Sequence, residues 1–419
     1  MNLTISDKAL GILESLKEFM NNQVIPSEDR YRREILDSGD PYHKPLVMEE
    51  LQAKARSIGL WNLFLPQMEW GGAGLSNLEF APICEEMGRS LIGAEVFNCH
   101  PPDSGNMGLL VDCGSRDQQE EWLIPLLNGD ISSCFAMTEP GVASSDANNI
   151  GALITRDGNS YVINGHKGPS TGAGRDVCKF AILAGVSNPD ASPYDRQSLV
   201  IVPLDAEGVE IVDTWDIYGY QYPLSQAEIR FHDVRVPAAN LIQREGDGFR
   251  IGQARLGPAR IHHCMRAIGL AERALELMCA RIVTRMTFGK PIADQGVIPD
   301  WIARSRIEIE QARLLTLKTA WMMDELGNKA ARKEIAAIKI AVPNIIQGII
   351  DRAVQAHGAI GVTQNTPLAE FWTHARILRI LDGPDEVHVR SLARWELKSQ
   401  QEACESKVSE LPVMRAQRY

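Results

Sequence analysis

Arg379-Ile380-Leu381-Asp382-Gly383-Pro384-Asp385-Glu386-Val387-His388, near the C-terminal end, is the stretch from which the rest of the chain can be interpreted. Asp-Gly-Pro interrupts a helix, because glycine tolerates unusual backbone angles and proline lacks a donor and disfavours the α region before it. Apolar residues precede the break and a helical run at 387–397 follows it. We therefore predict that Asp382 is held at a turn between two helices, where its carboxylate can face a cavity. An ordinary surface turn is the alternative, and this stretch taken alone favours it.

The composition predicts a globular protein of two or three domains, because 419 residues exceed what one core usually holds. A net charge of -11 and a pI near 5.4 argue against nucleic acid as a partner. Eight scattered cysteines without a CxxC pair favour reduced thiols. No signal peptide and no apolar run of about 20 residues is present, so we expect a cytoplasmic protein without a membrane span.

Periodicity divides the chain into helical, β and helical parts. Residues 1–130 follow a helical period, and alternating strands with tight turns replace it in the next hundred residues. Long helical runs, one of them interrupted by Pro343, then fill the C-terminal part. We predict an N-terminal helical domain at 1–130, an antiparallel, barrel-like β domain at 131–243, a helical bundle at 244–403 and a polar tail at 404–419.

Four segments outside the Asp-Gly-Pro turn carry distinctive motifs; in the first, a hydroxyl and small residues at a strand start can hydrogen-bond a planar heterocycle, and a domain linker is the alternative. They are Cys134-Phe135-Ala136-Met137-Thr138-Glu139-Pro140, Phe231-His232-Asp233-Val234-Arg235-Val236-Pro237, Arg285-Met286-Thr287-Phe288-Gly289-Lys290-Pro291 and Gln355-Ala356-His357-Gly358-Ala359-Ile360-Gly361. In order and spacing, over roughly residues 45–400, they resemble the acyl-CoA dehydrogenase superfamily of FAD enzymes. Leu256-Gly257-Pro258-Ala259-Arg260-Ile261-His262-His263 and the stretch quoted first resemble the branch of family members ten and eleven.

The resemblance implies the fold, the cofactor and the partners. It implies an N-terminal helical domain, a middle β-barrel and a C-terminal four-helix bundle, assembled as a homodimer or homotetramer. It further implies that the chain binds FAD, dehydrogenates an acyl-CoA to a trans-2-enoyl-CoA and passes electrons to an electron-transferring flavoprotein.

Residues around the flavin ring are also implied by the resemblance. Thr138 and the backbone at Met137 would bind the pyrimidine side of the ring, and Thr171 would bind near its N5 edge. Ser145 would lie near the flavin phosphate or the acyl-CoA. One additional residue separates Pro140 from Ser145 compared with the common family pattern, which makes this position less secure.

More distant FAD contacts are implied from a neighbouring subunit and from a glycine cluster. Arg285 and Phe288 would reach the FAD of the neighbour, and the alternative for Arg285 is a surface cation. Gln355, Gly358 and Gly361 would approach the adenosine half, since small residues allow close approach. A helix C-cap is the alternative for the glycines.

Asp382 aligns with the catalytic base of the family, which is commonly Glu. Such a base removes the α-proton, and we expect desolvation to raise its pKa toward the operating range. Arg260 would orient it, with a surface ion pair as the alternative, and Arg260 and Gly383 would border the substrate. The adjacent His262 and His263 do not predict a metal site, because neighbouring helix positions point to different faces.

One departure from the family pattern concerns the flavin environment. Relatives place bulky aromatic residues where this chain has Gly168-Pro169, which predicts an open space beside the ring. Looser FAD, faster attack by oxygen or room for a bulkier substrate would follow. A flavin-dependent oxidase or hydroxylase and a catalytically impaired flavoprotein therefore stay open beside the dehydrogenase.

Overall fold

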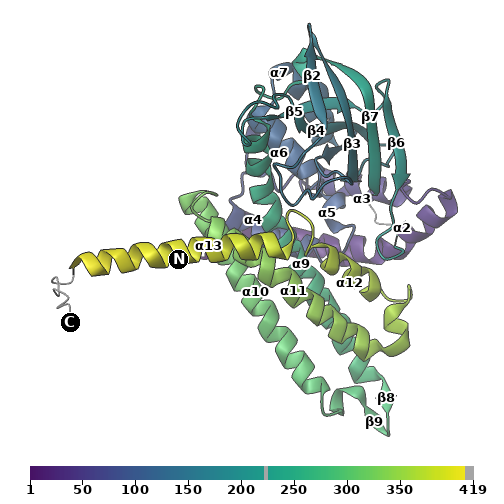
Figure 1. Ribbon diagram of the computed structural model, residues 1–419. Helices are drawn as coiled ribbons and strands as arrows, with labels where there is room; N and C mark the ends of the chain where they lie inside the picture. The colour runs from purple at the N-terminus through teal and green to yellow at the C-terminus, as the bar shows by residue number, and fades with distance from the viewer. Residues whose placement is uncertain (221–224, 411–419) are drawn as a thin grey trace, which may run out of the picture.

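The computed structural model describes residues 1–220 and 225–410, with side chains as far as residue 404, and it has the predicted helix–sheet–helix layout (Figure 1). Capping serines begin two of the first helices: Ser6 accepts from the amide of Ala9, and Ser76 forms a reciprocal capping box with Glu79. The N-terminal helices are α1 (Asp7–Phe19), α2 (Ile25–Ser38), α3 (Leu46–Ser57), α4 (Asn77–Met87), α5 (Gly93–Val96), α6 (Asp103–Cys113), α7 (Arg116–Gln118) and α8 (Ile124–Asn128).

A curled seven-stranded sheet follows, in the order β1-β4-β2-β3-β7-β6 with β5 paired to β4. The prediction of a wholly antiparallel sheet is wrong, because β4 pairs parallel with β1 and also with the start of β2. β1 enters from the N-terminal helices and its partner comes much later, which is the long connection that parallel strands need. The strands are β1 (Ser132–Ala136), β2 (Leu153–Asp157), β3 (Ser160–Thr171), β4 (Cys178–Val186), β5 (Gln197–Pro203), β6 (Val209–Thr214) and β7 (Gln226–Pro237).

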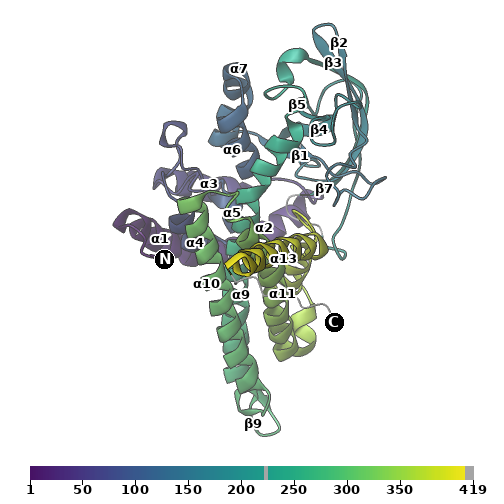
Figure 2. The same cartoon turned by 60° about the vertical axis from the view of Figure 1, so that its left-hand side comes forward.

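Three long helices run side by side below the sheet in both views (Figures 1 and 2). They share one hydrophobic core with the N-terminal helices, so the first and last parts of the chain are packed as one body. A small hairpin of β8 and β9 closes the end farthest from the sheet (Figure 1). These elements are α9 (Gly248–Thr284), β8 (Met286–Thr287), β9 (Lys290–Pro291), α10 (Ile298–Leu326) and α11 (Arg332–His357).

Two further helices flank the turn that carries Asp382. These are α12 (Leu368–Ile377) and α13 (Asp385–Glu410), and the latter projects from the body of the molecule (Figure 1). The polar tail predicted at 404–419 is helical as far as Glu410, and residues 411–419 lie outside the described part. No helix among the described residues combines the length and the apolar character needed to cross a bilayer.

Candidate active site

Asp382 lies in the turn between α12 and α13, as the sequence predicts, with an unusual backbone conformation. Its φ is 54°, in the left-handed region that aspartate tolerates better than most residues, and φ of Gly383 is 103°. A Cβ on Gly383 would lie 2.9 Å from Nε2 of His388. Glycine is therefore required here by both the backbone angle and the close approach of the imidazole.

Three side chains from distant parts of the chain hold this turn in place. Nζ of the fully buried Lys339 donates to the carbonyls of Leu378 and Leu381 at 2.6 and 2.8 Å. Nε of Arg260 lies 3.0 Å from the backbone carbonyl of Asp382, and Nε2 of His388 lies 3.2 Å from the same oxygen. Donors from α9, α11 and α13 thus bind the backbone and leave the carboxylate for other chemistry.

The carboxylate of Asp382 is ionised more readily than we expected from its burial. Desolvation raises its pKa, but the nearby His263 and the charges of Lys339 and Arg255 outweigh it and hold the pKa below the usual range. The prediction of a raised pKa is therefore wrong for the protein as it stands. Oδ2 is buried and accepts no hydrogen bond among the described residues, and Nε2 of His263 lies 3.4 Å from it.

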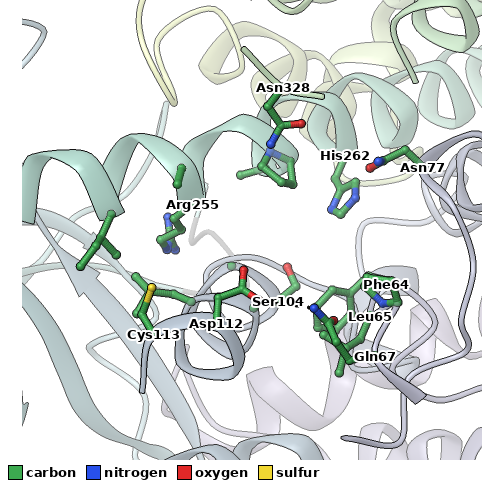
Figure 3. Close-up of a pocket in the computed structure, with 18 residues that line it drawn as sticks. Phe64, Leu65, Gln67, Asn77, Ser104, Asp112, Cys113, Arg255, His262 and Asn328 are labelled. Carbon is green, nitrogen blue, oxygen red and sulfur yellow. Dashed lines mark hydrogen bonds between the residues drawn. The ribbon is translucent and has the colours of Figure 1, made fainter. Parts of the chain in front are cut away.

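A cavity of about 310 Å³ lies on the adjoining face of α9 (Figure 3). Arg255 is half-buried at its wall, with Nε 2.9 Å from Oδ1 of Asn106 and the guanidinium over the ring of Phe135. Burial lowers the pKa of Arg255 to about 10. The wall has both apolar and polar surface. It includes Phe64, Leu65, Leu109, Arg255, Pro258 and His262.

The loop after β1, which holds the first pair of predicted flavin residues, is fixed by a buried ion pair. Nζ of Lys167 lies 2.6 Å from Oε1 of Glu139 and donates to the carbonyl of Met137 at 3.0 Å. Burial lowers the pKa of Lys167 to about 8, against the opposing effect of Glu139. The carbonyl of Thr138 accepts from the amide of Gly168 at 2.8 Å, so the loop is also joined to β3.

Thr171, at the end of β3, lies opposite Gln226 of β7. Its Oγ1 donates to Oε1 of Gln226 at 3.1 Å. Nε2 of Gln226 and Oγ of Ser170 are buried and have no hydrogen-bond partner among the described residues. Buried polar groups are normally paired, so the unsatisfied amide of Gln226 next to Thr171 fits a heteroatom-rich planar ligand such as the flavin ring.

The space predicted beside Gly168 is not simply open. Gly168 is buried, and a Cβ placed on it would lie 3.3 Å from Cη2 of Trp215, which follows β6. The pairing of β3 with β7 is irregular between Lys167 and Ser170. The backbone at Gly168, which carries no side chain, can therefore lie close to the indole of Trp215. An aromatic ring is therefore present near this position. It comes from the segment after β6, whereas the family pattern places it on β3.

The remaining predicted cofactor residues do not join this group within one chain. Arg285 and Phe288 lie at the exposed end by the β8–β9 hairpin, far from the sheet (Figure 1), and 96% of Phe288 is exposed. Gly358 caps α11 with a φ of 67°, and a Cβ on Gly361 would lie 2.5 Å from the carbonyl of Val354. Packing within the chain thus already requires Gly361. Gln355 and Ser145 are exposed.

Sequence reasoning missed four residues that now border the predicted site. Lys339 was detectable as the only charge in the apolar run Ala336–Val342, which is the pattern of a buried lysine. His263 was noticed only as half of a possible metal pair. Arg255 and Trp215 carry no local signal, because their neighbours are far away in the sequence.

Comparisons with known proteins agree on one family. Profiles of the N-terminal, middle and C-terminal domains of acyl-CoA dehydrogenases match residues 6–130, 134–234 and 246–397. The chain is 50% identical to the Mycobacterium tuberculosis protein named "Probable acyl-CoA dehydrogenase FadE2" over 95% of this chain and 97% of that one. It is 49% identical to chicken "Acyl-CoA dehydrogenase family member 11" over 96% of this chain, but it spans only 52% of that relative.

Solved structures agree with this result. A candidate acyl-CoA dehydrogenase from Mycobacterium abscessus superposes with a TM-score of 0.91 at 46% identity, covering 95% of this chain and 100% of the other. Butyryl-CoA dehydrogenase from Megasphaera elsdenii shares the fold, with a TM-score of 0.81 at 24% identity, covering 95% of this chain and 100% of that one.

Proposed function

Since this chain belongs to the acyl-CoA dehydrogenase family, we propose that it is an FAD-dependent enzyme that oxidises an acyl-CoA to a trans-2-enoyl-CoA. The observation that carries the proposal is the carboxylate of Asp382, held on a strained turn by Lys339, Arg260 and His388. A buried, ionised oxygen that accepts no hydrogen bond within the described part of the chain is available to accept a proton.

One residue is proposed to act as the base, and others are proposed to hold the base in place or to bind the flavin. Asp382 would take the α-proton, while Arg260 and Lys339 keep its backbone from moving away from the substrate. The flavin, when bound, supplies the acceptor for the hydride that leaves the β-carbon. Met137, Thr138, Thr171 and Gln226 would hold it, since Thr171 is hydrogen-bonded to Gln226, whose Nε2 is unsatisfied among the described residues.

The cavity of Figure 3 is the proposed site of the acyl chain. It is lined by Arg255 of α9, whose positive charge acts on the carboxylate of Asp382. Phe64, Leu65 and Leu109 would pack against methylene groups, and burial of each such group contributes about 0.8 kcal/mol. Gly383 and Ser145 stay proposed substrate contacts.

The proposal extends to the compartment and the electron acceptor. All eight cysteines are free thiols, which supports a reducing compartment such as the cytoplasm. An electron-transferring flavoprotein is the proposed electron acceptor. The chain spans about half the length of relatives such as chicken family member 11. The partners of a longer protein of that kind are therefore also only proposed here.

The test is an anaerobic titration of the FAD-loaded protein with a panel of acyl-CoA thioesters. We expect bleaching of the flavin spectrum by some of them, and we expect Asp382→Asn to slow bleaching by at least about 10²-fold while FAD stays bound. Unchanged bleaching in Asp382→Asn would place the base elsewhere. Peroxide formation in air without an added acceptor would favour an oxidase, and a protein that cannot be loaded with FAD would favour a non-catalytic role.

A further inference from the structure

The two adjacent histidines of α9 have separate environments. The ring of His262 stacks edge-on against Phe80, with centroids 5.0 Å apart, and it lines the cavity of Figure 3. The ring of His263 turns to the other side, where its Nε2 faces Oδ2 of Asp382 at 3.4 Å. Only the second histidine therefore reaches the proposed base.

Arg266 determines which nitrogen of His263 carries the ring proton. Its Nη2 lies 3.2 Å from Nδ1 of His263, one turn earlier on α9. A guanidinium only donates hydrogen bonds, so Nδ1 has to accept. In the neutral ring the single proton then resides on Nε2, which is the nitrogen that points at the carboxylate.

We infer that His263 is the positioning residue of the base: a neutral imidazole, fixed in one tautomer by Arg266, that directs an N–H at Oδ2 of Asp382. The inference rests on the proposed function, in which Asp382 removes the α-proton. At 3.4 Å the contact is longer than a hydrogen bond, and Oδ2 has no partner among the described residues, so this N–H is the donor available to it. The orientation leaves the carboxylate anionic until substrate supplies the proton.

The surroundings explain why the ring stays neutral. Burial lowers the pKa of His263, and the positive charges of Arg266 and of Lys339 on α11 act in the same direction, while Asp382 opposes them. His374 from α12 lines a small cavity together with His263 and Arg266, and Sγ of Cys84 from α4 is 3.9 Å from Nη1 of Arg266. A neutral donor lowers the pKa of Asp382 without becoming an acid that could return the proton.

The first test is the pH dependence of anaerobic bleaching by a reactive acyl-CoA. His263→Leu removes the donor, which raises the pKa of Asp382, so we expect the acid limb of the rate to move up by about one pH unit or more. His263→Gln keeps an N–H donor and should restore part of the shift. His262→Leu is the matched control, and it should change the response to different acyl chains without moving the acid limb. An unmoved acid limb in folded, FAD-loaded His263→Leu would overturn the inference.

A second test needs no active enzyme. In protein labelled with ¹⁵N at histidine, His263 should show a protonated Nε2 and an unprotonated Nδ1 that do not titrate near neutral pH, and Arg266→Leu should let the proton redistribute. A proton on Nδ1 of the wild-type ring would refute the inference. Loss of bleaching in Asp382→Asn concerns the proposed function alone, so the two failures are distinguishable.

Discussion

At the scale of single residues, Trp215 changes the expectation for the flavin environment. The buried Gly168 leaves no side chain of its own there, and the indole reaches this position from the segment after β6. Gly168 in turn donates to the carbonyl of Thr138, the residue proposed to bind the pyrimidine side of the ring. In the proposed arrangement the indole would cover one side of the bound flavin, and this is the property we propose for a dehydrogenase rather than an oxidase.

Replacing Trp215 should expose the reduced flavin to oxygen. We expect Trp215→Ala to speed reoxidation by air several-fold, measured by stopped-flow absorbance after anaerobic reduction and by peroxide formed. Trp215→Phe keeps a ring and should stay close to the wild type. Equal rates in all three proteins would mean that the indole does not border the flavin.

For single residues, part of the candidate site could be predicted from the sequence and part could not. The position of Asp382 at a turn followed from residue type, and the proximity of Arg260 was implied by the family resemblance; the structure has both. The direction of the pKa shift did not follow, because burial was the only effect visible in sequence. The charges that reverse it come from α9 and α11, more than forty residues away from the turn.

At the scale of elements, α11 fixes the turn between α12 and α13 through one ammonium group. Lys339 donates to two carbonyls at the end of α12 and has no carboxylate within ion-pair distance among the described residues. Lys339→Met leaves both carbonyls buried without a donor, so we expect a loss of about 2–3 kcal/mol in the free energy of unfolding, measured with urea.

Lys333 on the same helix provides the control for this prediction. It is partly exposed and its contact with Glu396 is 3.5 Å long, so Lys333→Met should change stability by less than about 0.5 kcal/mol. A loss in Lys339→Met as small as the loss in Lys333→Met would show that the two carbonyls find other hydrogen-bond donors. The loss in Lys339→Met should also appear as slower bleaching, since the turn carries the base.

Element boundaries could be predicted where local signals decide them. The break predicted at Asp-Gly-Pro separates α12 from α13, but α9 begins at Gly248 and continues through Leu256-Gly257-Pro258, although glycine and proline locally favour a break. Proline frees the carbonyl four residues earlier, at Ala254, and both residues line the cavity of Figure 3. Tertiary packing thus overrides the local signal at the place where the helix borders a cavity.

At the scale of the whole molecule, the long helices separate two groups of residues assigned to one cofactor. Thr138 and Thr171 lie at the sheet, while Arg285 and Phe288 lie beyond the other end of α9 (Figure 1). An exposed phenylalanine on a hairpin with a φ of 50° is unusual in an isolated chain. Both groups can contact one FAD if the hairpin belongs to a second subunit, which is the homodimer or homotetramer proposed for this family.

This arrangement predicts that assembly and FAD binding depend on each other. The protein should sediment as a dimer or tetramer, and Arg285→Ala should weaken FAD binding by about tenfold or more, because a charge-assisted hydrogen bond to the pyrophosphate is lost. FAD affinity is measured by fluorescence titration of the apoprotein. Arg304→Ala, which removes an exposed arginine paired with Asp300 on α10, is the control and should leave it unchanged. A monomer that binds FAD with full affinity would contradict the shared site, because one chain keeps the hairpin and the sheet apart.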